Sequence, residues 1–299
     1  YAKASPGEPN AHDSLGDALL ADDRLDEARL AYQRALDASE GNFWVSGHGM
    51  ATVSALQGDW FSARAAIEKA RRSAPQLDDR LKLMQWTAWS YLASNEPNEA
   101  LTALDDAEAD ARRAKLELRA AEAMLLKGQF QLLLGRDADA LKTFTAAGGK
   151  KTPTLNDGQR LGLETARLQG LAESQAKLGR IAAAEKSVTQ LRSVVEARPN
   201  NLTGQAAIAH ARGVIALAKK DPRLAASAFG ECAEASDTCR LDLSLAQDAA
   251  GDPILGAATR ASILRLNHRA PDYWWVRVRA AVGNTARATP TNAEERPSY

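Results

Sequence analysis

The sequence is poor in aromatic residues and in cysteine. Of its 299 residues, 5% are Phe, Trp or Tyr and two are cysteine, whereas alanine dominates the 45% hydrophobic fraction. Sheets depend on β-branched and aromatic side chains, and alanine suits close helix packing. The composition therefore predicts an all-α protein.

Net charge and long apolar runs are also missing. Thirty-eight Lys and Arg residues balance thirty-eight Asp and Glu residues, so no overall field draws the chain to phosphate backbones or anionic lipid. No apolar run approaches the ~20 residues that cross a bilayer, and no charged-then-apolar leader precedes the first apolar pattern. We expect neither a nucleic-acid partner nor membrane insertion.

Convergent reactive residues are missing as well. The four histidines, His12, His48, His210 and His268, lie far apart, and none has the short spacing of two metal ligands. None of the glycine-rich patterns that cradle phosphate occurs. The sequence thus predicts no catalytic residues, no metal site and no cofactor, and indicates that the protein is not an enzyme.

A helical hairpin pattern is present near the start of the chain. Small and apolar residues fall at helical spacing on both sides of a polar turn at 22–24. These residues are Leu15, Gly16, Leu19, Ala28, Tyr32 and Ala35. Gly16 and Ala28 are small where two antiparallel helices cross most closely, and the larger side chains fill the space beside them.

The same frame recurs down the chain, which is decisive for the architecture. A small residue begins the second helix of six recoverable units, at Ala28, Ala63, Ala100, Ala140, Ala184 and Ala225. A degenerate seventh unit has helices at 240–250 and 254–266. The spacing grows in the middle of the chain, which predicts longer helices or linkers there, and the stretch 148–153 is the clearest insertion.

This frame resembles the tetratricopeptide repeat family over residues 10–266. The family places a Leu-Gly pair and an aromatic residue on its first helix and an Ala, a ring and an Ala on its second; only the first aromatic is replaced, by Leu19. The resemblance implies a right-handed superhelical solenoid of about seven antiparallel helical hairpins.

The chain ends in an aromatic segment that differs from the repeats. Pro271 in a first turn and Gly283 as a stop predict a terminal helix that caps the last hairpin. The expected organisation is an N-terminal extension at 1–9, a solenoid at 10–268, a terminal aromatic helix at 269–283 and a C-terminal tail at 284–299.

In the family that the frame resembles, the concave face of the first helices receives a peptide or a partner helix. Carried over by frame, the inward-pointing candidates are Asp13, Asp17, His48, Thr52, Gln85, Trp89, Gln129, Gln169, Glu173 and His210. Trp89 is either a binding anchor or packing between adjacent repeats. Members that grip a C-terminal carboxylate use Lys, Arg and Asn here, so Asp13, Asp17 and His48 favour a basic or neutral ligand.

The resemblance therefore implies a protein-interaction scaffold that binds a protein or peptide partner. The alternative is a structural subunit that assembles with copies of itself into rings or filaments, because a solenoid has two open ends. The cluster Tyr273, Trp274 and Trp275 is more apolar than a solvated cap requires, and we expect it to form that interface.

Cys232 and Cys239 lie on successive elements whose ends are neighbours in such a solenoid. They form a disulfide, which fits an exported chain, or Cys232 is a small packing residue and Cys239 a bystander. The chain begins at Tyr1, which fits a mature protein whose leader was removed and fits an arbitrary terminus equally well. A periplasmic or extracellular location is favoured slightly over the cytoplasm.

Overall fold

The computed structural model describes residues 5, 7–148, 154–197 and 201–288, with side chains up to 282. Over this part of the chain all regular structure is α-helical. The helices are α1 (Pro9–Ala21), α2 (Leu25–Ala38), α3 (Trp44–Leu56), α4 (Trp60–Ser73), α5 (Leu77–Ala93), α6 (Pro97–Arg113), α7 (Glu117–Leu133), α8 (Asp137–Ala147), α9 (Asp157–Lys177), α10 (Ile181–Glu196), α11 (Leu202–Ala218), α12 (Pro222–Gly230), α13 (Asp237–Ala249), α14 (Pro253–Leu264) and α15 (Pro271–Ala288).

The first fourteen helices pair into seven hairpins, from α1 with α2 to α13 with α14. In each hairpin one residue with a left-handed backbone, φ between 59° and 91°, stands two positions after the first helix ends and two before the second begins. These residues are Asp23, Gly58, Asn95, Gly135, Gly179, Lys220 and Gly251. The predicted solenoid of seven hairpins is confirmed, and the degenerate seventh unit has the same turn as the others.

Close helix approach explains the small residues of the frame. The ring of Tyr32, on α2, lies where a Cβ atom at Gly16 of α1 or at Gly49 of α3 would overlap it. One ring is thus held between the first helix of its own hairpin and the first helix of the next. The first two hairpins therefore stack through the same side chain that closes the first one.

The middle of the solenoid has the longer helices that the spacing predicts. Helix α9 has 21 residues, whereas α1 and α3 have 13. The predicted insertion at 148–153 follows α8, and all of it but Gly148 lies outside the described residues.

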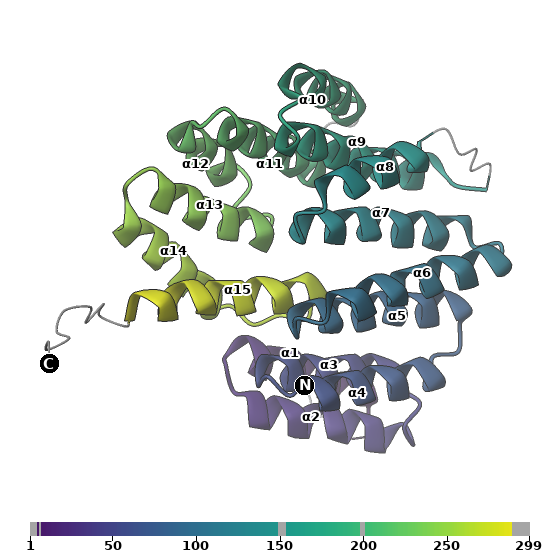
Figure 1. Ribbon diagram of the computed structural model, residues 1–299. Coiled ribbons are helices and arrows are strands. Elements are labelled where there is room, and N and C mark those ends of the chain that lie inside the picture. Colours follow the sequence, from purple (N-terminus) through teal and green to yellow (C-terminus); the bar gives the residue numbers. More distant parts are fainter. Residues whose placement is uncertain (1–4, 6, 149–153, 198–200, 289–299) are drawn as a thin grey trace, which may run out of the picture.

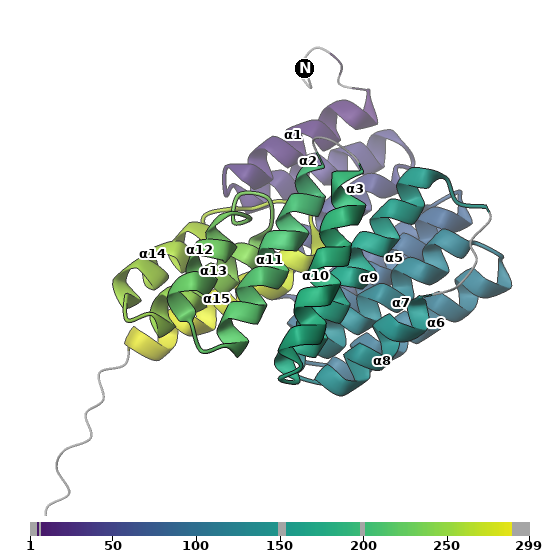
Figure 2. The same ribbon diagram turned by 90° about the horizontal axis from the view of Figure 1, so that it is seen from above.

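Helix α15 closes the solenoid on itself. It packs against α13 and α14 of the last hairpin and also against α3 and α5 near the other end of the chain. Figure 1 and Figure 2 show it between these two groups of helices. The packing on α13 and α14 agrees with the predicted cap, and the contacts with α3 and α5 were not predicted. Helix α15 also continues past Gly283, the predicted stop, to Ala288.

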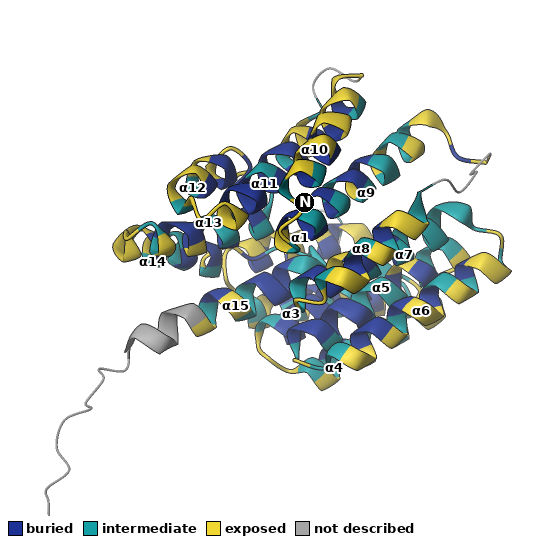
Figure 3. Cartoon of the chain, turned by 45° about the horizontal axis from the view of Figure 1, so that its top comes forward, coloured by how far each residue is buried: buried dark blue, intermediate teal, exposed yellow. Residues whose placement is uncertain are grey.

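The aromatic cluster that we expected at an assembly interface lies inside this closure. Tyr273, Trp274 and Trp275 are 0%, 1% and 8% exposed, and they join an apolar core that reaches from Ala51 to Ala280. The Trp274 ring packs edge to face against Trp86, with ring centroids 5.4 Å apart. Figure 3 shows that buried residues follow the faces shared between helices, while exposed residues follow the outer faces.

Candidate functional site

The closed solenoid surrounds a cavity of about 1520 Å³. Its walls come mainly from the first helices of the hairpins, α5, α7, α9, α11 and α13, and from α15. We call this cavity the central channel. Helix α15 contributes Asp272 and Trp275 to the lining.

The central channel brings together six of the residues that the frame places on the concave face. They are Gln85, Trp89, Gln129, Gln169, Glu173 and His210. The remaining candidates, from the first two repeats, do not reach it. Thr52 is fully buried and donates a hydrogen bond to the His48 carbonyl, 3.2 Å away.

A buried polar cluster forms one wall of the channel. His210 Nδ1 lies 2.7 Å from Glu173 Oε1, and His210 Nε2 lies 2.8 Å from Asp242 Oδ2. Gln169 Nε2 donates to the same Glu173 oxygen at 2.8 Å. These residues lie on α9, α11 and α13, so the cluster ties three consecutive repeats together.

The charges of this cluster determine what it can do. Burial works to lower the pKa of His210, but the Glu173 and Asp242 carboxylates outweigh it and raise this pKa to about 10. Burial likewise opposes ionisation of Glu173, yet the His210 charge and the hydrogen bonds from His210 and Gln169 lower its pKa. His210 therefore stays protonated at neutral pH and donates from both nitrogens, which leaves it no lone pair for general-base chemistry.

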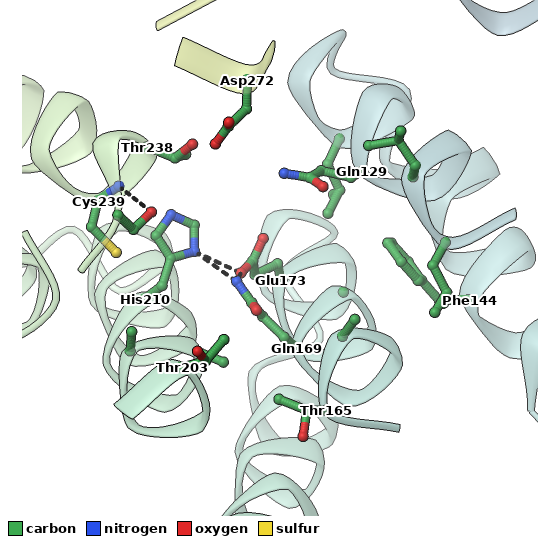
Figure 4. A pocket seen from close by; sticks show the side chains of 18 of the residues that line it. Gln129, Phe144, Thr165, Gln169, Glu173, Thr203, His210, Thr238, Cys239 and Asp272 are labelled. Carbon is green, nitrogen blue, oxygen red and sulfur yellow. Dashed lines mark hydrogen bonds and ion pairs between the residues drawn. The ribbon is translucent and has the colours of Figure 1, made fainter. Parts of the chain in front are cut away.

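Other polar side chains point into the same space. Figure 4 shows Gln129 from α7, Thr238 from α13 and Asp272 from α15 directed toward the hollow beside His210. Burial, and then the neighbouring carboxylate of Asp237, raise the pKa of Asp272. Thr238, Asp242 and Asp272 were missed in the sequence, because the frame is degenerate in the last hairpin and absent from α15.

Trp89 lines the central channel but is only 5% exposed. Its ring packs edge to face against Phe130, with centroids 4.5 Å apart. This contact supports the packing interpretation of Trp89, since most of its surface is already covered. A ligand in the channel would meet only its rim.

The acidic residues of the first repeat bind an arginine from the other end of the chain. Asp13 Oδ1 lies 2.7 Å from Arg269 Nη2, and Asp17 Oδ1 lies 2.5 Å from Arg269 Nε. The guanidinium carbon also sits 4.7 Å from the centroid of the Tyr32 ring. A basic group thus fills this face, as its charge predicts, but the group belongs to the same chain.

His48 lies next to this arginine. Burial and the charge of Arg269 hold the pKa of His48 well below its usual range, so its ring is neutral. Its Nε2 atom is buried and has no hydrogen-bond partner among the described residues. The His48 ring faces Trp86 edge on.

Cys232 and Cys239 are joined by a disulfide, with their Cα atoms 5.8 Å apart. Both side chains are buried, and Cys239 also lines the central channel. The bond links the segment after α12 to the start of α13, in agreement with the first of the two interpretations.

The described part of the chain contains neither a cluster of metal-binding side chains nor a helix suited to cross a membrane. No group of three or more His, Cys, Asp or Glu side chains there is placed to hold a metal ion. None of the helices in that part combines the length and the apolar character that crossing a membrane requires.

Known proteins share this architecture but little sequence. No protein-family model matches the chain, and no curated protein sequence matches it. The crystal structure of the apo form of RapI matches with a TM-score of 0.58 and 13% identity, covering 92% of this chain and 76% of that one. The chain has the tetratricopeptide repeat fold. A tetratricopeptide repeat protein from Parabacteroides merdae matches with a TM-score of 0.50 and 11% identity, covering 91% of this chain and 98% of that one.

At these identities the likeness establishes the fold alone. The seven similar turns, each with one left-handed residue, are consistent with this repeated fold. The tetratricopeptide arrangement places the first helix of each hairpin inward, and the His210 cluster and the central channel both lie on that face.

Proposed function

We propose that this protein is a non-enzymatic scaffold that holds a segment of a partner protein, or a peptide, in its central channel. The observation that carries the proposal is the cavity of about 1520 Å³ into which polar side chains converge from several inner helices. Sites for drug-sized molecules occupy roughly 300–1,000 Å³. The larger volume favours a polypeptide segment over a small metabolite.

The chemistry of the wall supports binding over catalysis. His210 is protonated and paired on both sides, so it is not available as a base. Gln129 and Thr238 offer uncharged donors and acceptors to the hollow. Such groups suit the amide groups of a peptide backbone.

A blocking substitution tests the channel directly. Gly162 lies on α9 in the channel wall, and a Cβ atom there would meet no atom within 4 Å. Gly162→Trp should therefore fill the channel without disturbing the helix packing. Gly230, on α12 away from the channel, has the same open surroundings, and Gly230→Trp is the matched control.

The assay uses peptides selected from a phage-displayed library on the native chain. We expect their affinity to fall at least tenfold for Gly162→Trp and to stay unchanged for Gly230→Trp. Peptides that bind both variants as tightly as the native chain would place the binding site elsewhere and reject the proposal.

Self-assembly through Tyr273, Trp274 and Trp275 remains the alternative function. In the closed chain these side chains have almost no exposed surface, so assembly through them requires release of α15. Size-exclusion chromatography with light scattering tests this alternative. A monomer at every concentration from micromolar to millimolar would exclude it.

A further inference from the structure

The connection between α14 and α15 reaches the first hairpin through polar contacts. Asn267 Nδ2 donates to Asp23 Oδ1 at 2.7 Å, and Asp23 is the left-handed residue of the first hairpin turn. Arg269 donates to Asp13, and more distantly to the Val45 carbonyl at 3.4 Å. We call residues 267–276 the clasp.

The acidic site under the clasp is organised by residues other than Arg269. Asp13 and Asp17 are one helical turn apart on α1, so both carboxylates face the same way. Ser46 Oγ donates to Asp13 Oδ1 at 2.6 Å, and the Tyr32 hydroxyl donates to Asp17 Oδ1 at 2.8 Å. The carboxylates therefore keep their positions when Arg269 leaves.

The Tyr32 ring completes a site for a guanidinium group. Arginine favours paired carboxylates in one plane and an aromatic face in another, and Arg269 makes both kinds of contact here. The site thus combines two carboxylates, from Asp13 and Asp17, with the aromatic face of Tyr32, and these three groups together recognise an arginine side chain.

Closure of the clasp leaves polar atoms without partners. Trp274 Nε1 and His48 Nε2 are buried with no hydrogen-bond partner among the described residues, and both rings contact Trp86. Burial also raises the pKa of Asp17 in spite of the nearby Arg269. Since water would satisfy these atoms on release, the closed state is less favourable than its apolar contacts alone imply.

We propose that the Asp13–Asp17–Tyr32 site binds an arginine side chain of a partner polypeptide, and that the clasp is a built-in competitor which the partner must displace. The partner segment carries an arginine followed by aromatic residues, as Arg269 is followed by the aromatic cluster in the clasp. This site is separate from the binding proposed for the central channel and does not depend on it.

The clasp and a partner segment compete for the same arginine site. A tethered segment has an effective concentration in the millimolar range, so it masks its site from a partner at micromolar concentration. Loosening the clasp without touching the site should therefore expose it.

The test uses the full chain and a labelled peptide with the sequence of residues 266–279 as the probe, read by fluorescence anisotropy. Asn267→Ala removes the contact with Asp23 but leaves Asp13, Asp17 and Tyr32 intact. We expect Asn267→Ala to bind the probe about tenfold more tightly than the native chain. Arg269→Ala, which empties the site, should bind it at least as tightly.

Three controls make the result specific. A probe with alanine in place of the arginine should bind at least tenfold more weakly, and Asp13→Asn with Asp17→Asn should abolish the gain that Asn267→Ala gives. Arg24→Ala, which removes exposed ion pairs with Glu27 and Asp22, should bind the probe like the native chain.

Equal affinity of the native chain and Asn267→Ala, with both folded by circular dichroism, would overturn the proposal. So would a gain that survives loss of both aspartates. If Arg269→Ala does not fold, Asn267→Ala still decides the question. Gly162→Trp should leave probe binding unchanged, so failure at this site and failure of the channel proposal are separable.

Discussion

Arg269 and Asp13 form an ion pair with a nitrogen–oxygen distance of 2.7 Å although 256 positions separate them in the sequence. Asp13 lies on the first helix, and Arg269 lies just before the last. The pair therefore spans the whole solenoid and marks the point where its two ends meet.

Removal of one partner from this pair should destabilise the closed chain. Asp13 is 6% exposed and also accepts a hydrogen bond from Ser46. In Asp13→Asn the neutral amide no longer balances the positive charge of the largely buried Arg269 guanidinium. We expect the free energy of unfolding to fall by about 2–3 kcal/mol. Urea denaturation followed by circular dichroism measures it.

A double-mutant cycle separates the pair from its surroundings. Arg269→Met alone should also destabilise, and the two substitutions together should cost less than the sum of the single losses. Strict additivity would mean that the two side chains do not act on each other.

The hairpins could be predicted from the sequence because each depends on residues close together in it. The spacing of Gly16 and Ala28 around a polar turn predicts one pair of antiparallel helices. Because the same spacing recurs along the chain, the repeat could be recognised. The same frame placed Glu173 and His210 on the inner face, where the structure finds them in contact.

Closure by α15 could not be predicted, since a contact across 256 positions leaves no periodic signal. The apolar character of Trp274 led us to expect an interface between chains, whereas the side chain is buried within its own chain; composition does not distinguish the two. Asp242 was missed for a related reason: its repeat lost the marker residues that would have set its frame.

Alanine substitution at two glycines of α9 should change the free energy of unfolding in opposite directions. A Cβ atom at Gly170 would overlap the Phe144 ring, so Gly170→Ala should lower the free energy of unfolding by about 1–3 kcal/mol. Gly162, eight residues earlier on α9, faces open space, and Gly162→Ala should raise it by up to about 1 kcal/mol. Urea denaturation of both variants tests this, and a loss at Gly162 as large as that at Gly170 would contradict it.

The turn between α11 and α12 carries a strain that glycine should relieve. Lys220 has φ 63°, a conformation that side chains with a Cβ atom disfavour by about 1–2 kcal/mol. Part of that gain is lost because glycine makes the unfolded chain more flexible, so Lys220→Gly should stabilise by about 0.5–1 kcal/mol. Lys220→Ala keeps the strain and serves as the control; thermal unfolding should show no increase for it.

Reduction of the disulfide between Cys232 and Cys239 should destabilise the last two hairpins. The bond closes a short loop with a sequence separation of 7, and the chain-entropy model gives about 2 kcal/mol for a loop of this size. Thiol titration of the native protein should find no free thiol before reduction and two after it. Equal unfolding midpoints for oxidised and reduced protein would show that the bond contributes nothing to stability.

Stability should depend on pH through His210. Its pKa is about 10 in the folded chain and 6.5 in a free histidine, so folding favours the protonated form. The stability from this group is therefore fully present below pH 6.5 and is lost as the pH rises through 10. We expect the free energy of unfolding to fall steadily between pH 7 and pH 9.5.

His210→Gln identifies the source of that slope. The variant starts less stable because Glu173 loses its buried cation, but it has no imidazole to titrate in this range. Burial raises the pKa of Tyr32 and of Tyr273 above 10, so neither phenol ionises in the same window. Denaturant titrations at half-unit pH steps should show the slope in the native chain and a much flatter line in His210→Gln. The same slope in both proteins would mean that His210 is not protonated between its two carboxylates.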